Sequence, residues 1–310
     1  MKKIFFMFIF FCLLQAKWQD YGFNYKYEVG IMTGGIKGTY IKFGNDIMTL
    51  MDKTNSKVLV RPIVSKGSQI NLIALKESPG VDLAIVQADV MQAYKESGII
   101  SRILNEIRYI TFLYNEEVHI ITLKNAPYRF VTDLVGKNVC IGSKGSGTEL
   151  TSNNIFTILD LNVNKLNCST RDSFNKLLNH QVEAIILVGG KPLGSIIPYL
   201  DKIKFLSFKD NSIDILSSTY LPAKFTSNDY RGILDTKTIA VPSILVAYNW
   251  TYGPRYKSLK QFVSYFMNNL ETLKEIGLQQ NNKKWKQINF MKRVPGWKRH
   301  KSVREAWLEN

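Results

Sequence analysis

The sequence predicts an α/β protein with two lobes joined by two crossing strands. The chain has 310 residues, which is enough for about two domains, and 45% of them are hydrophobic, which is enough to build packed cores. A strand, a glycine-rich loop and a helix alternate three times over 27–92, and a second set of the same kind covers 138–188. This repetition favours parallel sheets with helices on their faces, because right-handed strand–helix–strand crossovers bury the apolar sides of both the sheet and the helices.

Residues 1–16 are predicted to be an export signal. Lys2 and Lys3 precede an unbroken apolar run, Ile4–Leu14, and the sequence becomes polar from Lys17. The run is too short to span a bilayer core, which needs about 20 helical residues, but it has the length of a signal-peptide core. We expect cleavage after Ala16 and export of the mature chain. The alternative is an uncleaved membrane anchor.

The first lobe is expected to begin with three strand–helix pairs. Its predicted strands are Tyr27–Met32, Lys57–Val64 and Asp82–Val86. The helix after the first strand carries apolar residues at helical spacing, namely Phe43, Ile47, Leu50 and Met51. Ser68 is a candidate N-cap of the second helix, and Asp89 with Gln92 has the form of a capping box at the start of the third.

The second lobe repeats this order. Its predicted strands are Val118–Leu123, Asn138–Gly142, Lys165–Ser169 and Glu183–Val188, and its predicted helices are Glu149–Leu159 and Asp172–Leu178. The turn-prone segment 124–127 is a candidate first crossing between the lobes. The return crossing is Thr238–Tyr248, which Pro242 is expected to bend or to confine to a sheet edge. We therefore expect lobe 1 to comprise 24–121 and 240–310, and lobe 2 to comprise 122–239.

The number and spacing of the cysteines and histidines predict neither a metal site nor a disulfide scaffold. Cys12 lies in the apolar N-terminal run, whereas Cys140 and Cys168 lie in predicted strands, where cysteine is usually a small buried hydrophobe. A bond between these two is the alternative that an oxidising compartment allows. The histidines are too widely spaced to predict a metal site; they are His119, His180 and His300. We expect no metal and no cofactor.

The formal net charge of +16 leaves three classes of partner open: nucleic acid, a membrane surface or an acidic small ligand. Residues 283–304 contain nine Lys or Arg and no acidic residue, with Trp285 and Trp297 among them. Interleaved basic and aromatic residues are typical of proteins that bind anionic polymers or membranes. The alternative is that Phe290, Val294 and Trp297 pack this segment onto a lobe. Because an exported protein rarely meets nucleic acid, we predict no nucleic-acid partner.

No catalytic or nucleotide-binding motif stands out. The segment Gly30–Lys37 lacks the Gly-Lys-Ser/Thr ending of a phosphate loop, and Gly145–Leu150 lacks the last glycine of a dinucleotide fingerprint. There is no Gly-x-Ser-x-Gly nucleophile elbow, and no pair of carboxylates is singled out. We therefore predict that the protein is not an enzyme. An exported enzyme on the same fold is the alternative.

Small polar residues follow the predicted strands at the same topological place: Thr33-Gly34-Gly35, Gly67-Ser68, Ser143–Thr148 and Gly189-Gly190. Ligands of open parallel sheets bind at the carboxyl ends of the strands, where helix N-termini present free N–H groups and a positive partial charge. Ser146 and Glu149 have the form of a capping box, which would leave the Thr148 hydroxyl and the next amides for a ligand. A small anionic or zwitterionic solute fits this pattern. The alternative is that these are ordinary turns and caps.

The same loops resemble a known family in order and spacing. The segments that carry the resemblance are Gly30–Tyr40, Gly67–Leu72, Asp82–Val90 and Gly145–Glu149. They resemble the extracytoplasmic solute receptors of TRAP transporters, in the TAXI (immunogenic protein) branch. The resemblance is good from Tyr27 to Tyr199 and weaker from Leu200 onward.

The resemblance implies a two-lobed type II periplasmic binding protein fold, in which each lobe is a mainly parallel sheet flanked by helices and the ligand cleft lies between the lobes. It also implies a periplasmic receptor, expected to be a monomer, that delivers its solute to a TRAP membrane permease driven by an ion gradient. The ligands of the family imply a small carboxylate, such as a glutamate-like amino acid or a dicarboxylate.

The ligand-binding residues that the resemblance implies are Thr33, Gly34, Gly35, Tyr40, Ser68, Gln87, Ser146, Thr148, Gly189 and Gly190. Two positions depart from the family pattern. Ile41 stands where relatives often have a second tyrosine, and Phe225 stands where they have a tyrosine, so a phenolic donor is lost. Lys37 and Lys191, beside the predicted loops, would add positive potential for an anion, although exposed lysines are common on any surface.

Overall fold

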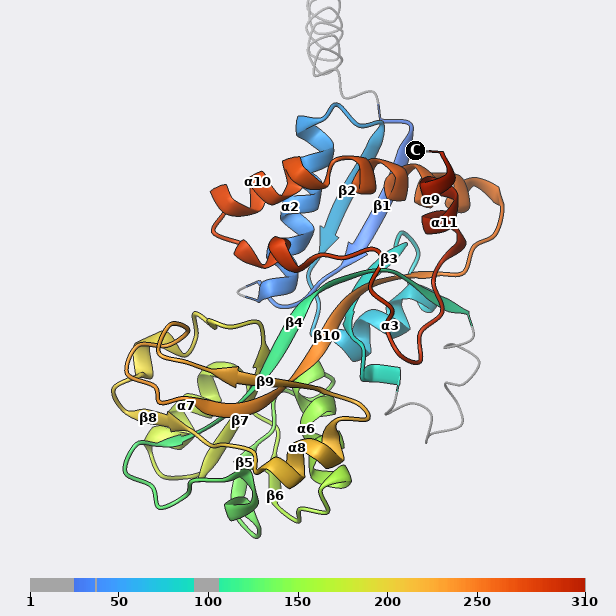
Figure 1. The fold of residues 1–310 in the computed structure, drawn as a ribbon. Helices are drawn as coiled ribbons and strands as arrows, with labels where there is room; N and C mark the ends of the chain where they lie inside the picture. The colour runs from blue at the N-terminus through green and yellow to red at the C-terminus, as the bar shows by residue number, and fades with distance from the viewer. Residues whose placement is uncertain (1–24, 37, 92–105, 310) are drawn as a thin grey trace, which may run out of the picture.

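The computed structural model describes residues 25–36, 38–91 and 106–309. Within these residues the chain forms two α/β lobes, and two long strands pass from one lobe into the other (Figure 1). These strands are β4 (Ile107–Leu123) and β10 (Thr236–Tyr248). The predicted export signal at 1–16, Lys37, and Gln92 of the predicted capping box lie outside the described residues.

Lobe 1 contains three parallel strands in the order β2, β1, β3, followed by the antiparallel β10 and β4. The parallel strands are β1 (Tyr27–Met32), β2 (Val58–Ile63) and β3 (Leu83–Gln87). The helices are α2 (Thr39–Lys53), α3 (Ser68–Glu77), α9 (Gly253–Asn268), α10 (Leu270–Gln279) and α11 (Lys301–Leu308), with the 3-10 helix η3 (Lys283–Gln287). The strand–helix order that the sequence predicted for β1 to β3 is confirmed.

Alternate residues of β3 pack on opposite faces of the lobe 1 sheet, as the two-residue period of a strand requires. Leu83 and Ile85 belong to the core that α2, α9 and α10 cover, whereas Ala84 and Val86 belong to the core beneath α3. All four side chains are fully buried. Coverage of both faces explains why β3 is apolar from Leu83 to Val86 instead of alternating with polar residues.

Lobe 2 is built around the parallel strands β7, β5 and β6, next to β4. Its strands are β5 (Asn138–Cys140), β6 (Asn164–Leu166), β7 (Ala184–Gly189), β8 (Ile203–Phe205) and β9 (Leu221–Phe225). Its helices are α6 (Gly147–Ile158), α7 (Thr170–Leu178) and α8 (Asp210–Leu216), with the 3-10 helices η1 (Val131–Leu134) and η2 (Ile197–Tyr199). The parallel runs expected in each lobe are present. The crossing strands, β8 and β9 are antiparallel to their neighbours and make the whole sheet mixed.

β4 is longer than predicted and is itself the first crossing. The sequence predicted a strand only over Val118–Leu123, but β4 begins at Ile107. Its first part pairs with β10, and its second part pairs with β7 and β8 of lobe 2. The turn predicted after it is present, since Ala126 N–H donates to the carbonyl of Leu123 (3.0 Å), but it follows the crossing instead of making it. The lobe boundaries expected at 121/122 and 239/240 stay predictions.

Pro242 lies in the interior of β10, which is a central strand and not the edge strand that the proline suggested. Its carbonyl accepts a hydrogen bond from Ala88 N–H (2.8 Å) on the β3 side of the strand. The proline nitrogen points to the same side of β10. On that side β9 pairs with β10 up to Ala240 and β3 pairs with it from Ser243 onward, so Pro242 lies between the two partner strands. The missing N–H therefore breaks no ladder bond. Register shifts follow Ser243 in the pairing with β4, as at a bulge that bends a strand.

Cys140 and Cys168 form a disulfide bond, with their Cα atoms 5.6 Å apart. The sequence favoured two unlinked core residues and kept the bond as the alternative. The burial is as expected, because both side chains lie in the core between the sheet and α7. The correction is the covalent link, which joins the end of β5 to the loop before α7.

Reduction of this disulfide is expected to lower the free energy of unfolding by about 3.5 kcal/mol, because the bond closes a loop with a sequence separation of 28. Urea unfolding of the wild type with and without dithiothreitol measures the difference. The Cys140→Ala/Cys168→Ala variant should show no response to dithiothreitol. Identical unfolding midpoints for oxidised and reduced wild type would contradict the prediction.

The basic C-terminal segment packs onto lobe 1. Phe290, Val294 and Trp297 are all buried, in the two cores of that lobe, so the packing alternative is confirmed. The Trp297 indole N–H also donates to the carbonyl of Ala88 (3.0 Å). Among the described helices, none combines the length and the hydropathy needed to cross a membrane.

Candidate functional site

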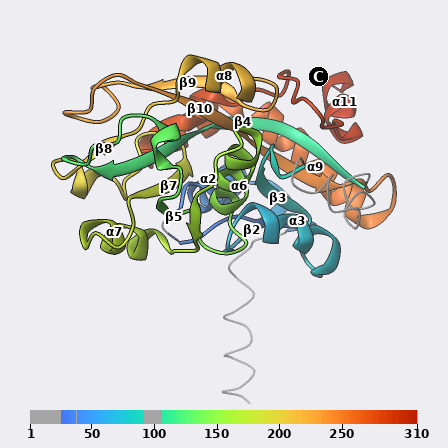
Figure 2. The same ribbon diagram turned by 90° about the horizontal axis from the view of Figure 1, so that it is seen from below.

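The two lobes touch where α6 of lobe 2 meets β3 and α3 of lobe 1 (Figure 2). Gly147, the first residue of α6, lies directly against lobe 1. A Cβ atom at this position would overlap the side-chain oxygen of Gln87 and would lie 2.9 Å from Ser68 Oγ. Glycine allows this close approach without displacing the two side chains. The first N–H groups of α6, on Gly147 and Thr148, have no partner within the helix and carry its positive dipole end.

Five buried polar side chains surround this contact, and each has an oxygen that makes no hydrogen bond of good geometry with another described residue, although several of these oxygens lie close to one another. They are Tyr40, Gln87, Tyr114, Glu116 and Ser243, which we call the interlobe cluster. Four elements supply them: α2, β3, β4 and β10. A buried polar group left unpaired costs about 1–3 kcal/mol, so a group of incompletely paired polar side chains in one buried place calls for a functional reason.

Glu116 is the central charged group of the cluster. Its Oε2 accepts a hydrogen bond from the side-chain amide of Gln87 (3.2 Å). Burial raises the pKa of the Glu116 carboxyl to about 7, so the group titrates near neutral pH. Hydrogen-bonding contacts with Tyr40, Ser243 and Gln87 act in the opposite direction and lower this pKa. Burial, followed by the nearby Glu116, also raises the pKa of the Tyr40 and Tyr114 hydroxyls well above the ordinary value. Both tyrosines therefore remain neutral and keep a proton to donate.

Asp89 connects the lobes beside the cluster. Its Oδ2 accepts hydrogen bonds from the hydroxyls of Thr151 (2.7 Å) on α6 and Tyr220 (3.0 Å), both in lobe 2. Burial raises the pKa of the Asp89 carboxyl to about 6, although both hydroxyls lower it. The sequence expected Asp89 to cap a helix; in the structure its carboxylate bonds to the other lobe.

The β1–α2 loop contains the first group of predicted ligand residues. Thr33 is buried, and its hydroxyl donates to the carbonyl of Ile63 (2.8 Å), so it ties β1 to β2. Gly34 packs on Tyr40, because an added Cβ would lie 3.4 Å from the Cβ of that residue, and Gly35 is exposed. The loop therefore positions Tyr40, the one predicted residue of this group that belongs to the interlobe cluster.

Ser68 and Gln87 lie side by side at the lobe contact. Ser68 does not cap α3 as predicted: Gly67 precedes the helix, and no side-chain cap is formed. The Ser68 hydroxyl instead accepts the backbone N–H of Gln87 (3.0 Å). This bond joins the start of α3 to the end of β3 and holds Gln87 towards α6.

The capping motif at the start of α6 is formed, with one change. Ser146 Oγ accepts the N–H of Glu149 (3.2 Å), as predicted, but the Glu149 carboxylate accepts from Gly145 N–H (2.6 Å) and not from Ser146. The Thr148 hydroxyl oxygen accepts the N–H of Val188 (3.4 Å), which ties α6 to β7, and the role of Thr148 in ligand binding stays a prediction.

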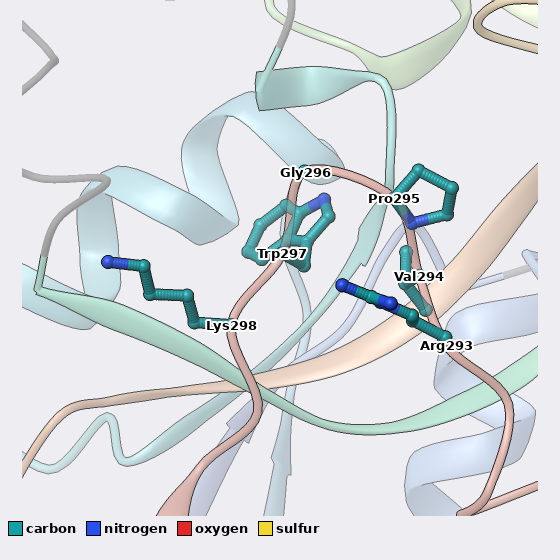
Figure 3. Close-up of a pocket in the computed structure, with 6 residues that line it drawn as sticks. All are labelled: Arg293, Val294, Pro295, Gly296, Trp297 and Lys298. Atoms are coloured by element: carbon teal, nitrogen blue, oxygen red, sulfur yellow. The ribbon is translucent and has the colours of Figure 1, made fainter.

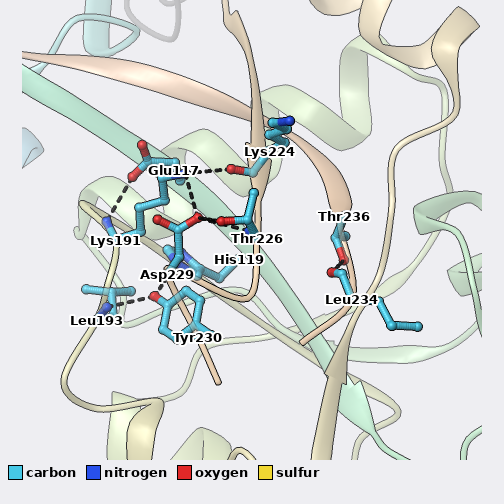
Figure 4. A network of polar contacts seen from close by, with 10 residues as sticks. All are labelled: Glu117, His119, Lys191, Leu193, Lys224, Thr226, Asp229, Tyr230, Leu234 and Thr236. Carbon is cyan, nitrogen blue, oxygen red and sulfur yellow. Dashed lines mark hydrogen bonds and ion pairs between the residues drawn. The ribbon is translucent and has the colours of Figure 1, made fainter. Parts of the chain in front are cut away.

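A polar network between β4 and lobe 2 holds the loop that follows the two glycines at the end of β7 (Figure 4). The Glu117 carboxylate accepts a hydrogen bond from the backbone N–H of Lys191 (2.9 Å). The Tyr230 hydroxyl accepts one from the backbone N–H of Leu193 (2.7 Å). The Lys191 ammonium pairs with Asp229 (2.9 Å). The positive charge that the sequence placed beside this loop is therefore already neutralised within lobe 2.

His119 lies beneath the same network as a core residue. A ring nitrogen lies 2.7 Å from the Tyr230 hydroxyl, and the ring stacks on Phe225 with centroids 4.5 Å apart. Burial lowers the pKa of His119 to about 3, so the ring is neutral. In the part of the chain that the structure describes, no three His, Cys, Asp or Glu side chains form a group that could hold a metal ion.

The sequence missed Tyr114, Glu116 and Ser243, because all three lie inside long strands and not in loops. One signal was available. Asn115, Glu116 and Glu117 interrupt a run that is otherwise apolar and that continues as a strand on both sides. Consecutive polar residues at the centre of a buried strand indicate a place where the strand leaves one core and enters the next.

A surface pocket with a volume of about 520 Å³ lies on the C-terminal segment (Figure 3). Its lining residues are Arg293, Val294, Pro295, Gly296, Trp297 and Lys298. None of them belongs to the interlobe cluster. We therefore place the candidate site at the lobe contact and not at this pocket.

The model of a family described as the NMT1-like family matches residues 31–284 of the chain. Among solved structures, the substrate binding protein of an amino acid ABC transporter is 10% identical, with a TM-score of 0.51 over 81% of this chain and 98% of that one. The periplasmic aliphatic sulphonate binding protein of Escherichia coli is 15% identical, with a TM-score of 0.51 over 83% and 76%.

An ancestral arginine-binding protein bound to arginine is 13% identical, with a TM-score of 0.51 over 82% of this chain and 98% of that one. At such identities the likeness is one of fold. The two-lobed periplasmic binding protein fold that the sequence predicted is confirmed.

Proposed function

Since the chain belongs to the NMT1-like family and has the two-lobed fold of periplasmic binding proteins, we propose that it is a solute receptor that binds a small molecule between its lobes. The observation that carries the proposal is the interlobe cluster. Its unpartnered oxygens are buried at the lobe contact, where a small polar solute would supply the missing hydrogen bonds. The proposal involves no catalytic step.

The solute class we propose is a small carboxylate, such as a glutamate-like amino acid or a dicarboxylate. The N-terminus of α6 offers free N–H groups and a positive dipole end to an anion. Tyr40 and Tyr114 add neutral hydroxyl donors. The side-chain oxygens of Gln87 and Glu116 are acceptors, which suit the ammonium group of an amino acid.

The proposed biological role is delivery of this solute to a TRAP membrane permease by an exported, periplasmic and monomeric receptor. Support for this role comes from the predicted export signal and from the resemblance of four loops to TAXI-branch receptors. The test is uptake of the bound solute into vesicles that contain the permease. Uptake should require both the receptor and an imposed ion gradient. Equal uptake with and without the receptor would contradict the role.

A carboxylate ligand is expected to raise the melting temperature of the mature protein. At a ligand concentration a hundredfold above the dissociation constant, binding to the folded state contributes about 2.7 kcal/mol. A thermal-shift panel of amino acids, dicarboxylates and keto acids measures the effect. Tyr40→Phe should reduce the shift, whereas Tyr27→Phe, on β1 and outside the interlobe cluster, should leave it unchanged. Absence of any shift at millimolar concentrations would contradict the proposed function.

A further inference from the structure

Lys284, on η3 of the C-terminal segment, extends to the lobe contact. A Cβ atom at Gly190 of lobe 2 would overlap Lys284 Cε and would lie 2.8 Å from Lys284 Cδ. The same Cβ would lie 3.0 Å from Cε2 of Tyr114, a member of the interlobe cluster. The lysine side chain therefore lies between the glycine loop after β7 and the cluster. Gly190 is the residue that makes room for it.

The backbone around Lys284 is held firmly by its neighbours. The Trp285 indole N–H and the Asn282 side-chain amide both donate to Asp46 Oδ2, at 2.7 and 2.8 Å. Trp285 is buried against Phe43, with ring centroids 4.1 Å apart. Because this anchor fixes η3 on α2, it directs Lys284 towards the lobe contact, while its basic neighbours Lys283 and Lys286 are exposed.

The Lys284 ammonium forms no hydrogen bond or ion pair with another described residue, although the side chain is half-buried. The charges that face it are Glu117 and Glu116 on β4, which favour its cationic form, and Lys42 on α2, which opposes it. Burial is the largest effect and lowers the pKa of the Lys284 ammonium. Glu117 already accepts the N–H of Lys191. The ammonium is thus a partly desolvated cation that lacks a direct partner.

We infer that Lys284 is the specificity-determining cation of the interlobe site and that it forms an ion pair with a carboxylate of the bound solute. The inference rests on the proposed function and deepens it, since it adds the C-terminal segment of lobe 1 to the elements that form the site. Contact between Gly190 and Lys284 shields the ion pair from water when the lobes meet, and a shielded charge-assisted pair is stronger than an exposed one. Recognition of the anion and approach of the lobes then reinforce each other.

The test is isothermal titration of L-glutamate and succinate into the wild type, Lys284→Met, Lys284→Arg and Lys283→Met. Lys284→Met should weaken carboxylate binding by about 10- to 100-fold, the range expected for a hydrogen bond to a charged group. Lys284→Arg, which keeps the charge, should retain most of the affinity. Lys283→Met, the exposed neighbour, should bind like the wild type.

Two further readouts separate ligand contact from a structural role. Without ligand, Lys284→Met should melt at or above the wild-type temperature, because it removes a desolvated charge, and with ligand its affinity should depend less on salt concentration than that of the wild type. Equal carboxylate affinity of the wild type and Lys284→Met would overturn this inference and leave the proposed function in place. Failure of the wild type to bind either carboxylate would overturn both.

Discussion

Replacement of Gly147 by valine is expected to weaken carboxylate binding by about 10- to 100-fold, because it inserts a side chain where the lobes meet. A Cβ at this position overlaps the side-chain oxygen of Gln87 and lies 2.7 Å from Gln87 Cδ and 2.9 Å from Ser68 Oγ. Gln87 cannot move aside freely, since it is buried and its amide donates to Glu116. Valine would therefore keep the lobes apart without disturbing either core.

Titration of L-glutamate and succinate, combined with small-angle scattering with and without ligand, measures both effects. The wild type should become more compact with ligand, and Gly147→Val should not. Gly194→Val, in the same lobe but with open space around the added side chain, is the matched control and should behave like the wild type. Wild-type affinity in Gly147→Val would contradict a ligand site at the contact between α6 and β3.

Raising the pH from 5 to 8 is expected to destabilise the protein through Asp89 and Glu116, by on the order of 4 kcal/mol for the pair. Burial raises their pKa values from 3.8 to about 6 and from 4.5 to about 7, so the folded state binds protons more tightly than the unfolded state. Their stabilisation is complete below the ordinary pKa values near 4 and is lost as the pH rises through about 6 and 7. The groups around Glu116 are Tyr40, Gln87, Ser243 and Asp89, with Lys284 also facing it.

Urea unfolding at pH 5, 6, 7 and 8 measures this contribution as a difference between proteins, because other groups add their own pH dependence. Asp89→Asn/Glu116→Gln should show a flatter profile than the wild type. Glu77→Gln, which alters an exposed carboxylate on α3, should follow the wild type. Parallel profiles for the wild type and the double variant would indicate that the two carboxyls are not buried between the lobes in solution.

The individual strands and helices were largely predictable because each leaves a local pattern. β1 was predicted with the bounds that the structure has, since the apolar residues Val29 and Ile31 alternate along it and a glycine-rich loop follows. β4 was predicted in part, because Asn115, Glu116 and Glu117 break its apolar run at the point where it passes between two cores. Pro242 made an edge position seem more favourable than it is. Its missing N–H is harmless because it lies between two neighbouring strands, and only the order of strands in the sheet reveals this.

The predicted ligand-binding residues stay predictions, and the structure shows that only some of them lie together. Tyr40, Ser68 and Gln87 lie at the lobe contact as the loops suggested, whereas Thr33 and Thr148 use their hydroxyls to tie strands and helices together. Tyr114, Glu116 and Ser243 carry no local signal of a ligand site. Lys284 resembles any other lysine of a basic tail until the packing of Trp285 shows where the segment lies.

The sequence by itself determined the α/β class, the repeated strand–loop–helix order and the placement of small polar residues after strands, because these depend on side-chain period and turn chemistry within a few residues of chain. Only the tertiary structure decided which polar groups face one another across the lobes, that Cys140 and Cys168 are bonded, and that Lys284 reaches the interlobe cluster. Such contacts join residues far apart in the chain, and they arise from how the two crossing strands bring the lobes together.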